Sequence, residues 1–153
     1  MQKLIVVRHG DYDRLSQKLT EWGRRQIGVL GEKIRSFRNG SSIVIISSDD
    51  SRTKESAGIL GEMLDVSPET QVKLYSSEIS PANLPWAFAL VKSLQEKWDI
   101  VILVTHFEYV GELPAYYAQN ELGLMARSWE IEKGGAWVVD CKKREIEHFW
   151  AAH

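Results

Sequence analysis

Six short apolar or β-branched runs, separated by longer amphipathic and polar segments, set the pattern of the chain. Two of these runs, Ile43–Ile46 and Ile100–Val104, are apolar at every position, which is typical of central strands covered on both faces. The predicted strands span Lys3–Arg8, Ser42–Ser47, Gln71–Tyr75, Ile100–Thr105, Ala136–Asp140 and Glu145–Trp150.

Helical periodicity occupies the segments between the strands, where apolar residues recur at spacings of three and four. The first predicted helix follows Thr20, whose hydroxyl suits an N-cap position, and Ser51 or Asp50 suits the same position in the second. A third pattern runs from about Leu84 to Trp98. The apolar faces of the first two helices consist of Ile27, Leu30, Ile34 and Phe37, and of Ala57, Leu60 and Leu64.

A fourth helix is expected after His106, with an interruption before Pro114, because proline removes a backbone donor and clashes with the preceding turn. The alternation of strands and helices predicts an α/β fold, a three-layer α/β/α sandwich around a mostly parallel sheet. Segment 134–150 contains two strands joined by a polar turn, which predicts an antiparallel C-terminal strand. Residues 1–153 contain no repeat and no linker, so we expect a single domain.

Composition and charge narrow the range of partners. A net charge of −2 over 153 residues gives no general attraction to nucleic acid or to an anionic membrane, so we expect neither as a partner. No apolar stretch approaches the roughly 20 residues of a membrane span, and the N-terminal run lacks the pattern of a signal peptide. The single cysteine, Cys141, excludes an internal disulfide and makes the reducing cytoplasm the expected location.

Cationic and titratable residues follow three of the predicted strands at the point where each strand ends. Arg8 and His9 come at the end of the first strand, Arg52 lies in the segment after the second, and His106 follows Ile100–Thr105. In open α/β sheets, ligands bind beyond the carboxyl ends of the strands. We therefore expect these four side chains to converge at one edge of the sheet.

Each of these residues also has an ordinary structural explanation. A single arginine is usually a solvated surface charge, and a single histidine is more often a structural hydrogen-bonding group than a catalyst. Gly10 suits a tight turn, and Asp49 and Asp50 suit helix caps. The functional interpretation depends on the two arginines and two histidines being found together.

Two arginines and two histidines together indicate an anion-binding pocket, and phosphate is the anion that we expect it to bind. A guanidinium bonds two phosphate oxygens at once and keeps its charge at any working pH. The sequence contains no HxxxH, CxxC or DxDxD pattern, so we expect no metal and no other cofactor. Neighbouring positive charge lowers a histidine pKa, which favours a neutral, nucleophilic His9 with His106 bonded to a phosphoryl oxygen. Charge alone leaves open which histidine attacks.

The order of these motifs resembles the histidine phosphatase, or phosphoglycerate mutase-like, superfamily. Motif order and spacing match from residue 4 to about residue 110, and the closing strand pair also fits. The matching motifs are Arg8-His9-Gly10, Leu19-Thr20-Glu21-Trp22-Gly23-Arg24-Arg25-Gln26, Ser47-Ser48 followed by Arg52-Thr53, and Val104-Thr105-His106.

The resemblance implies a covalent mechanism in which His9 takes the phosphoryl group and water then releases it. Arg8, Arg52 and His106 would form the rest of the phosphate pocket. The backbone amide of Phe107, at a helix start, would add a further donor to the same oxygens.

The general acid of the family corresponds by position to Glu78, although Ile79-Ser80-Pro81 follows it instead of a glycine-rich segment. Two interpretations of Glu78 therefore stay equally open, a general acid and a solvated loop residue. The other acids expected near this edge are Asp11, Asp49, Asp50 and Glu108.

The short segment 65–99, which leaves no room for a large lid, most resembles the small SixA-like phosphohistidine phosphatases. A phosphoramidate bond to imidazole breaks readily once the leaving ring is protonated, so a strong enzyme acid matters less. We therefore expect a phosphorylated protein, carrying phosphohistidine, as the substrate. Two alternatives stay open: a small phosphorylated metabolite, on which Trp86 or Tyr109 would stack, and a non-catalytic phosphate-binding module.

Overall fold

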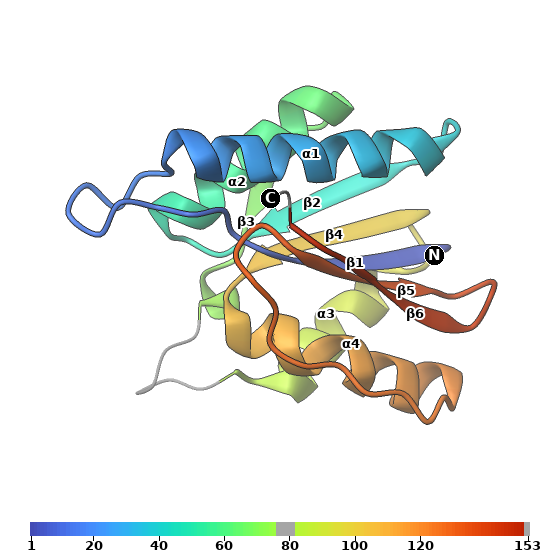
Figure 1. Cartoon of the computed structure of the whole chain (residues 1–153). Helices are drawn as coiled ribbons and strands as arrows, with labels where there is room; N and C mark the ends of the chain where they lie inside the picture. Colours follow the sequence, from blue (N-terminus) through green and yellow to red (C-terminus); the bar gives the residue numbers. More distant parts are fainter. Residues whose placement is uncertain (76–81, 152–153) are drawn as a thin grey trace.

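The computed structural model describes residues 1–75 and 82–151, which form a six-stranded sheet with helices on both faces (Figure 1). The strands are β1 (Lys3–Arg8), β2 (Ile43–Ser47), β3 (Glu69–Thr70), β4 (Ile100–Thr105), β5 (Ala136–Asp140) and β6 (Glu145–Phe149). The helices are α1 (Glu21–Arg38), α2 (Ser51–Leu64), α3 (Leu84–Leu94) and α4 (Phe107–Leu122), together with the 3₁₀ turn η1 (Val72–Leu74). None of the described helices combines the length and the apolarity that a bilayer span requires.

The strands lie in the order β3-β2-β4-β1-β5-β6. The pairs β3–β2, β2–β4 and β4–β1 are parallel, whereas β5 runs antiparallel to both β1 and β6. This topology confirms the expected α/β fold, with a mostly parallel sheet and an antiparallel strand near the C-terminus. Arg8 at the end of β1 lies opposite Thr105 at the end of β4, so the residues that follow both strands leave the sheet at the same edge.

Alternate residues of β1 divide the apolar core into two halves. Leu4 and Val6 pack on the side of α3 and α4, whereas Ile5 and Val7 pack on the side of α1 and α2. All four side chains are fully buried, and burial of each contributes about 1.5–3 kcal/mol to stability. Because helices cover both faces (Figure 1), the central strands are apolar at successive positions rather than at alternate ones.

Two helix starts agree with the sequence. Thr20 is the N-cap of α1, and its hydroxyl oxygen accepts a hydrogen bond from the Gly23 amide over 3.0 Å. Asp50 occupies the N-cap position of α2. The third helix ends at Leu94, earlier than the predicted end at Trp98.

The prediction of a strand at Gln71–Tyr75 is wrong. Val72–Leu74 forms a 3₁₀ turn, and the strand in this region is the shorter β3. Leu74 is fully buried, and its carbonyl oxygen accepts a 2.7 Å hydrogen bond from the hydroxyl of Thr105. Because a side chain of β4 satisfies this carbonyl, the apolar run here is buried without being part of the sheet.

The prediction of a break before Pro114 is also wrong, because α4 runs through this residue. The hydroxyl of Ser128 donates to the Gly111 carbonyl over 2.7 Å, and the Ser128 oxygen accepts from the Ala115 amide over 3.2 Å. Ser128 thus bonds both backbone groups of the pair Gly111 and Ala115, which spans Pro114. The helix therefore continues past its proline.

Candidate active site

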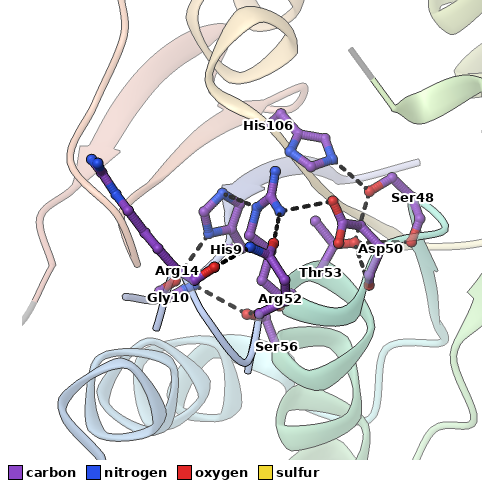
Figure 2. Close-up of polar contacts among 10 residues, drawn as sticks. His9, Gly10, Arg14, Ser48, Asp50, Arg52, Thr53, Ser56 and His106 are labelled. Atoms are coloured by element: carbon purple, nitrogen blue, oxygen red, sulfur yellow. Dashed lines mark hydrogen bonds and ion pairs between the residues drawn. The ribbon is translucent and has the colours of Figure 1, made fainter. Parts of the chain in front are cut away.

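The carboxyl ends of β1, β2 and β4 bring the four predicted side chains to one cavity of about 320 Å³. Arg8 and His9 come from the end of β1, Arg52 from the first turn of α2, and His106 from the end of β4. Figure 2 shows Arg52 and His106 beside His9, although these residues are far apart in sequence. The sheet edge is thus the site at which the expected cations and imidazoles meet.

His9 is held in a single tautomer. Its Nδ1 lies 2.9 Å from the carbonyl oxygen of Gly10, and since a carbonyl only accepts, Nδ1 carries the proton. The Nε–H of Arg52 donates to Nε2 of His9 over 3.3 Å, which requires the lone pair to be on Nε2. The nitrogen free of a proton is therefore the one beside Arg52 (Figure 2).

His9 is neutral at physiological pH. The residue is 4% exposed, and this burial is the main cause that lowers its pKa to about 3. The positive charges of Arg52 and Arg8 lower the pKa further, while the hydrogen bond to Gly10 opposes the shift. A buried neutral imidazole with an unprotonated Nε2 has the form that a nucleophile requires.

The turn that carries His9 is tightly packed against two helices. A Cβ atom at Gly10 would lie 2.6 Å from the carbonyl oxygen of Gly23 in α1, a separation that leaves room only for glycine. The Gly10 amide donates to Ser56 Oγ over 3.1 Å, and the Ser56 hydroxyl donates to the Arg52 carbonyl over 2.8 Å. The positions of His9 and of α2 are therefore linked.

Arg52 is oriented by an ion pair with Asp50. Nη1 of Arg52 lies 2.9 Å from Oδ2 of Asp50, and both side chains are mostly buried. Although Asp50 is the N-cap residue of α2, its carboxylate caps none of the described helix amides. Nη1 also donates to Oε1 of Gln17 over 3.2 Å. These contacts fix the guanidinium with its Nε–H at His9.

Arg8 is anchored by one end of its guanidinium. Its Nη1 donates to the carbonyl oxygen of Ile131 over 2.6 Å, and the group lies 5.5 Å from the centre of the Phe107 ring. Its Nε is buried and has no hydrogen-bond partner among the described residues. A buried donor without a partner costs about 1–3 kcal/mol. An oxyanion in the cavity would remove this cost, so the unpaired Nε fits a phosphate site.

His106 is the N-cap residue of α4, and its ring centre lies 5.6 Å from that of His9. Nε2 of His106 lies 2.9 Å from Ser48 Oγ. Burial and then the charge of Arg52 lower the pKa of His106 to about 4, against the opposing effect of Asp50.

Phe107 follows His106 as the first residue of α4 and also lines the cavity. Its amide belongs to the first turn of the helix, where backbone donors lack intrahelical partners and the helix dipole favours an anion. The amide thus has the position that the sequence predicts for a phosphate donor.

No family model matches the sequence, and no curated protein matches it either. Solved structures do match. The protein histidine phosphatase SixA complexed with tungstate has 18% identity and a TM-score of 0.73, over 97% of this chain and 95% of SixA. The putative phosphohistidine phosphatase SixA from Agrobacterium tumefaciens has 14% identity and a TM-score of 0.70, over 99% and 98% of the two chains. The mycobacterial glucosyl-3-phosphoglycerate phosphatase in complex with VO3 has 18% identity and a TM-score of 0.68, over 100% of both chains.

The chain has the histidine phosphatase fold. All three neighbours are named phosphatases, and their structural match confirms the fold that the sequence motifs suggest. The cavity of this histidine phosphatase fold lies where Arg8, His9, Arg52 and His106 meet.

Four further side chains that the sequence did not indicate line the cavity. Tyr12 lies edge-on to His9 at 5.4 Å and under the guanidinium of Arg52 at 4.7 Å. Arg14 and Lys133 add two further cations to the lining, and Tyr75 contacts the ring of His106. The acidic-aromatic stretch after Gly10 is the sequence signal for Tyr12, whereas Lys133 comes from a distant loop and leaves no signal.

The candidate acids fall into different environments. Glu78 lies outside the described residues, and Glu108 lines the cavity. Asp11 accepts a 2.9 Å hydrogen bond from the Thr20 hydroxyl, and Asp49 pairs at the surface with Lys54. Among residues 1–75 and 82–151, no three His, Cys, Asp or Glu side chains are grouped so that they could hold a metal ion.

Proposed function

We propose that this chain is a phosphatase that works through a phosphorylated His9 and needs no metal ion. The observation that carries the proposal is the contact between the unprotonated Nε2 of His9 and the Nε–H of Arg52. A neutral imidazole is a nucleophile toward phosphorus, and a guanidinium is a preferred partner of phosphoryl oxygens. The attacking atom and the group that binds the target thus lie side by side.

In the first step, Arg8, Arg52 and His106 bind the phosphoryl oxygens, and the Phe107 amide adds a donor. The Nε–H of Arg52 moves from His9 to an oxygen of the substrate, which frees the Nε2 lone pair. A bond forms between Nε2 and phosphorus while the bond to the leaving group breaks. The Gly10 carbonyl keeps the proton on Nδ1 and stabilises the positive charge that develops on the ring.

In the second step, water attacks the phosphorus of phospho-His9. An oxygen–phosphorus bond forms, the Nε2–phosphorus bond breaks, and inorganic phosphate leaves. Two guanidinium groups accompany the phosphoryl group throughout. At an effective dielectric constant of ~20, each favourable charge pair at 4 Å contributes roughly 4 kcal/mol before desolvation is subtracted.

Glu78 is the proposed proton donor to the leaving group. Replacement of Glu78 by glutamine is expected to slow hydrolysis of alkyl phosphates more than hydrolysis of aryl phosphates, because aryl leaving groups need less protonation. Equal slowing of both substrates would argue against this role.

The proposed substrate is protein phosphohistidine. One similar structure is named protein histidine phosphatase SixA, and another is named putative phosphohistidine phosphatase SixA. The described residues between Leu64 and Ile100 contain β3, η1 and α3, and no larger inserted unit that would close over a small substrate. An imidazole leaving group also reduces the need for a strong enzyme acid.

A small phosphate monoester is the second candidate, and a specific observation favours it. A larger cavity, of about 680 Å³, lies next to the phosphate site and shares Tyr75 with it. Trp86 and Tyr109, the side chains expected to stack on a small substrate, line this cavity together with Lys73. Its size is within the range of small-molecule sites. One similar structure is named glucosyl-3-phosphoglycerate phosphatase.

The test compares rates of phosphate release from a phosphohistidine-containing protein and from a panel of sugar, nucleotide and aryl monoesters. We expect the phosphohistidine protein to have the highest kcat/KM, at least tenfold above any monoester, a difference of about 1.4 kcal/mol in transition-state binding. A monoester with the higher value would replace the proposed substrate by the second candidate.

Replacement of His9 by alanine separates catalysis from binding. Hydrolysis of every substrate should be lost, while tungstate binding falls only moderately because both arginines remain. Unchanged hydrolysis would reject the covalent scheme. If even the unmodified protein binds tungstate but hydrolyses nothing, the chain is a phosphate-binding module.

A further inference from the structure

A chain of buried hydroxyl groups lies behind His106 (Figure 2). Ser48 Oγ lies 2.9 Å from Nε2 of His106 and 2.7 Å from Oγ1 of Thr53. Both Ser48 and Thr53 are fully buried, so water does not compete for these bonds. Neither hydroxyl belongs to the proposed phosphate pocket, and the reaction described above makes no use of them.

The direction of this chain is set at Thr53. Its Oγ1 lies 2.9 Å from the carbonyl oxygen of Ser48 and 3.1 Å from that of Asp50. Carbonyl oxygens only accept hydrogen bonds, so the one hydroxyl proton of Thr53 is directed to them. The oxygen of Thr53 is then left to accept from the Ser48 hydroxyl, as its 2.7 Å separation indicates.

The tautomer of His106 follows from that direction. Because the Ser48 hydroxyl donates to Thr53, its oxygen accepts from the imidazole, and Nε2 of His106 therefore carries a proton. A neutral His106 then has its lone pair on Nδ1. Figure 2 shows this second ring nitrogen on the side of Arg52 and His9.

We propose that Thr53 is a positioning residue: acting through Ser48, it holds His106 in the Nε2–H tautomer and leaves Nδ1 as the atom that takes up a proton from solvent when an oxyanion binds. The proton uptake rests on the proposed function, because it requires an oxyanion in the cavity. The tautomer itself does not. A lone pair on Nδ1 repels a phosphoryl oxygen, whereas a protonated Nδ1 donates to it.

The charges around His106 set its pKa and therefore whether the ring takes up this proton at pH 7. The groups that face the ring from the packed elements are Arg52 of α2 and Asp50 at its N-cap, Glu108 of α4, Arg8 and His9 of β1 and its following turn, and Tyr75. In the empty site, burial and Arg52 hold the pKa of His106 near 4, so the ring is neutral at pH 7. A bound dianion stabilises the imidazolium and raises that pKa.

The tautomer is tested with ¹⁵N-histidine-labelled protein, because protonated and unprotonated ring nitrogens have clearly different ¹⁵N chemical shifts. The unmodified protein without ligand should show His106 with a protonated Nε2 and an unprotonated Nδ1. In Thr53→Val the Ser48 hydroxyl loses its acceptor and turns to donate to Nε2, so the spectrum should change to the Nδ1–H tautomer. Thr53→Ser, which keeps the hydroxyl, should restore the original tautomer.

Thr105→Val is the matched control. Thr105 is fully buried next to His106 in sequence, and its hydroxyl donates to Leu74 rather than to the chain behind His106. This variant should keep the Nε2–H tautomer. An Nδ1–H tautomer in the unmodified protein, or an unchanged tautomer in a folded Thr53→Val, would overturn the proposal.

Proton uptake is measured by titration calorimetry with tungstate at pH 7, in buffers of different ionisation enthalpy. We expect uptake of about one proton per tungstate by the unmodified protein and clearly less by Thr53→Val, whose Nδ1 already has its proton. Binding without uptake would refute the coupling while leaving the tautomer result intact. If the unmodified protein binds tungstate but hydrolyses no substrate, the proposed function is rejected, while the tautomer and the proton uptake on tungstate binding can still be measured.

Discussion

Nη1 of Arg52 lies 2.9 Å from Oδ2 of Asp50, although Asp50 is the N-cap residue of α2 and its carboxylate is placed by the backbone to cap that helix. The carboxylate instead orients the guanidinium that contacts His9. The N-cap side chain thus places a cation beside His9 instead of capping the helix. This arrangement predicts that Asp50 affects catalysis more than helix stability.

Replacement of Asp50 by asparagine should lower kcat/KM about tenfold, a loss of about 1.4 kcal/mol, because Arg52 loses its charged partner. The Asp50 side chain makes no cap bond that the substitution could remove, and the side-chain oxygen of asparagine can still accept from Arg52, so the melting temperature should change little. Asp49→Asn is the matched control, because Asp49 pairs with Lys54 at the exposed surface. Steady-state kinetics and thermal unfolding check both variants. Equal effects of the two substitutions would show that the Asp50–Arg52 contact has no catalytic role.

Gly10→Ala should destabilise the fold by about 1–3 kcal/mol and lower activity, because the added Cβ meets the carbonyl oxygen of Gly23 and displaces His9. Gly28→Ala in α1 is the control, since a Cβ there meets nothing within 4 Å. Removing a helical glycine should stabilise the protein by about 0.5–1 kcal/mol. Urea unfolding of both variants measures the difference, and a neutral Gly10→Ala would contradict the packing described for the turn.

Stability should fall as the pH drops below about 6.5, because His9 is held neutral in the folded protein. The pKa of His9 is about 3 in the folded protein and 6.5 in the unfolded chain, so the unfolded chain binds more protons between these two pH values. Between pH 7 and pH 5, the titration of His9 alone should lower the free energy of unfolding by about 2 kcal/mol. His106, with a pKa of about 4, acts in the same direction.

The contribution of His9 is isolated with His9→Gln, which does not titrate. Denaturant unfolding at pH 7 and pH 5 should show a smaller loss of stability for this variant than for the unmodified protein. The difference should approach the expected 2 kcal/mol, within a factor of about two. An identical pH dependence in both proteins would mean that His9 titrates normally when folded.

Ser128→Ala should destabilise the protein by about 1–2 kcal/mol, because the Gly111 carbonyl and the Ala115 amide both lose their hydrogen bond to Ser128. In a Pro114→Ala background the helix can form its regular bonds, so the same substitution should cost less. Ser93→Ala, in an exposed part of α3, is the control and should change stability by less than about 0.5 kcal/mol. Equal effects of Ser128→Ala in both backgrounds would show that the stabilisation by Ser128 does not depend on Pro114.

The sequence was sufficient to predict the central strands of the sheet and the convergence of the main site residues at one edge. The bounds of β1, β4 and β5 are as predicted, because each of these buried strands leaves an apolar run that ends at polar or charged residues. The convergence of Arg8, His9, Arg52 and His106 then follows from the direction of the strands, which a parallel sheet fixes.

The features that the sequence did not reveal depend on contacts between distant segments. The hydrogen bonds that support α4 around Pro114 come from Ser128 in a later loop, and no local sequence pattern predicts them. Lys133 reaches the cavity in the same way. The apolar run near Leu74 has the composition of a strand, but a hydroxyl of Thr105 takes the place of a neighbouring strand.

The central claim is that Nε2 of His9 becomes phosphorylated during turnover. Mass spectrometry of protein mixed briefly with substrate and quenched in alkali, which preserves phosphohistidine, measures this directly. The account predicts one phosphate on the peptide that contains His9, present in the unmodified protein and lost in His9→Ala. Steady turnover with no phosphate on His9, or with phosphate on a different residue, would contradict it.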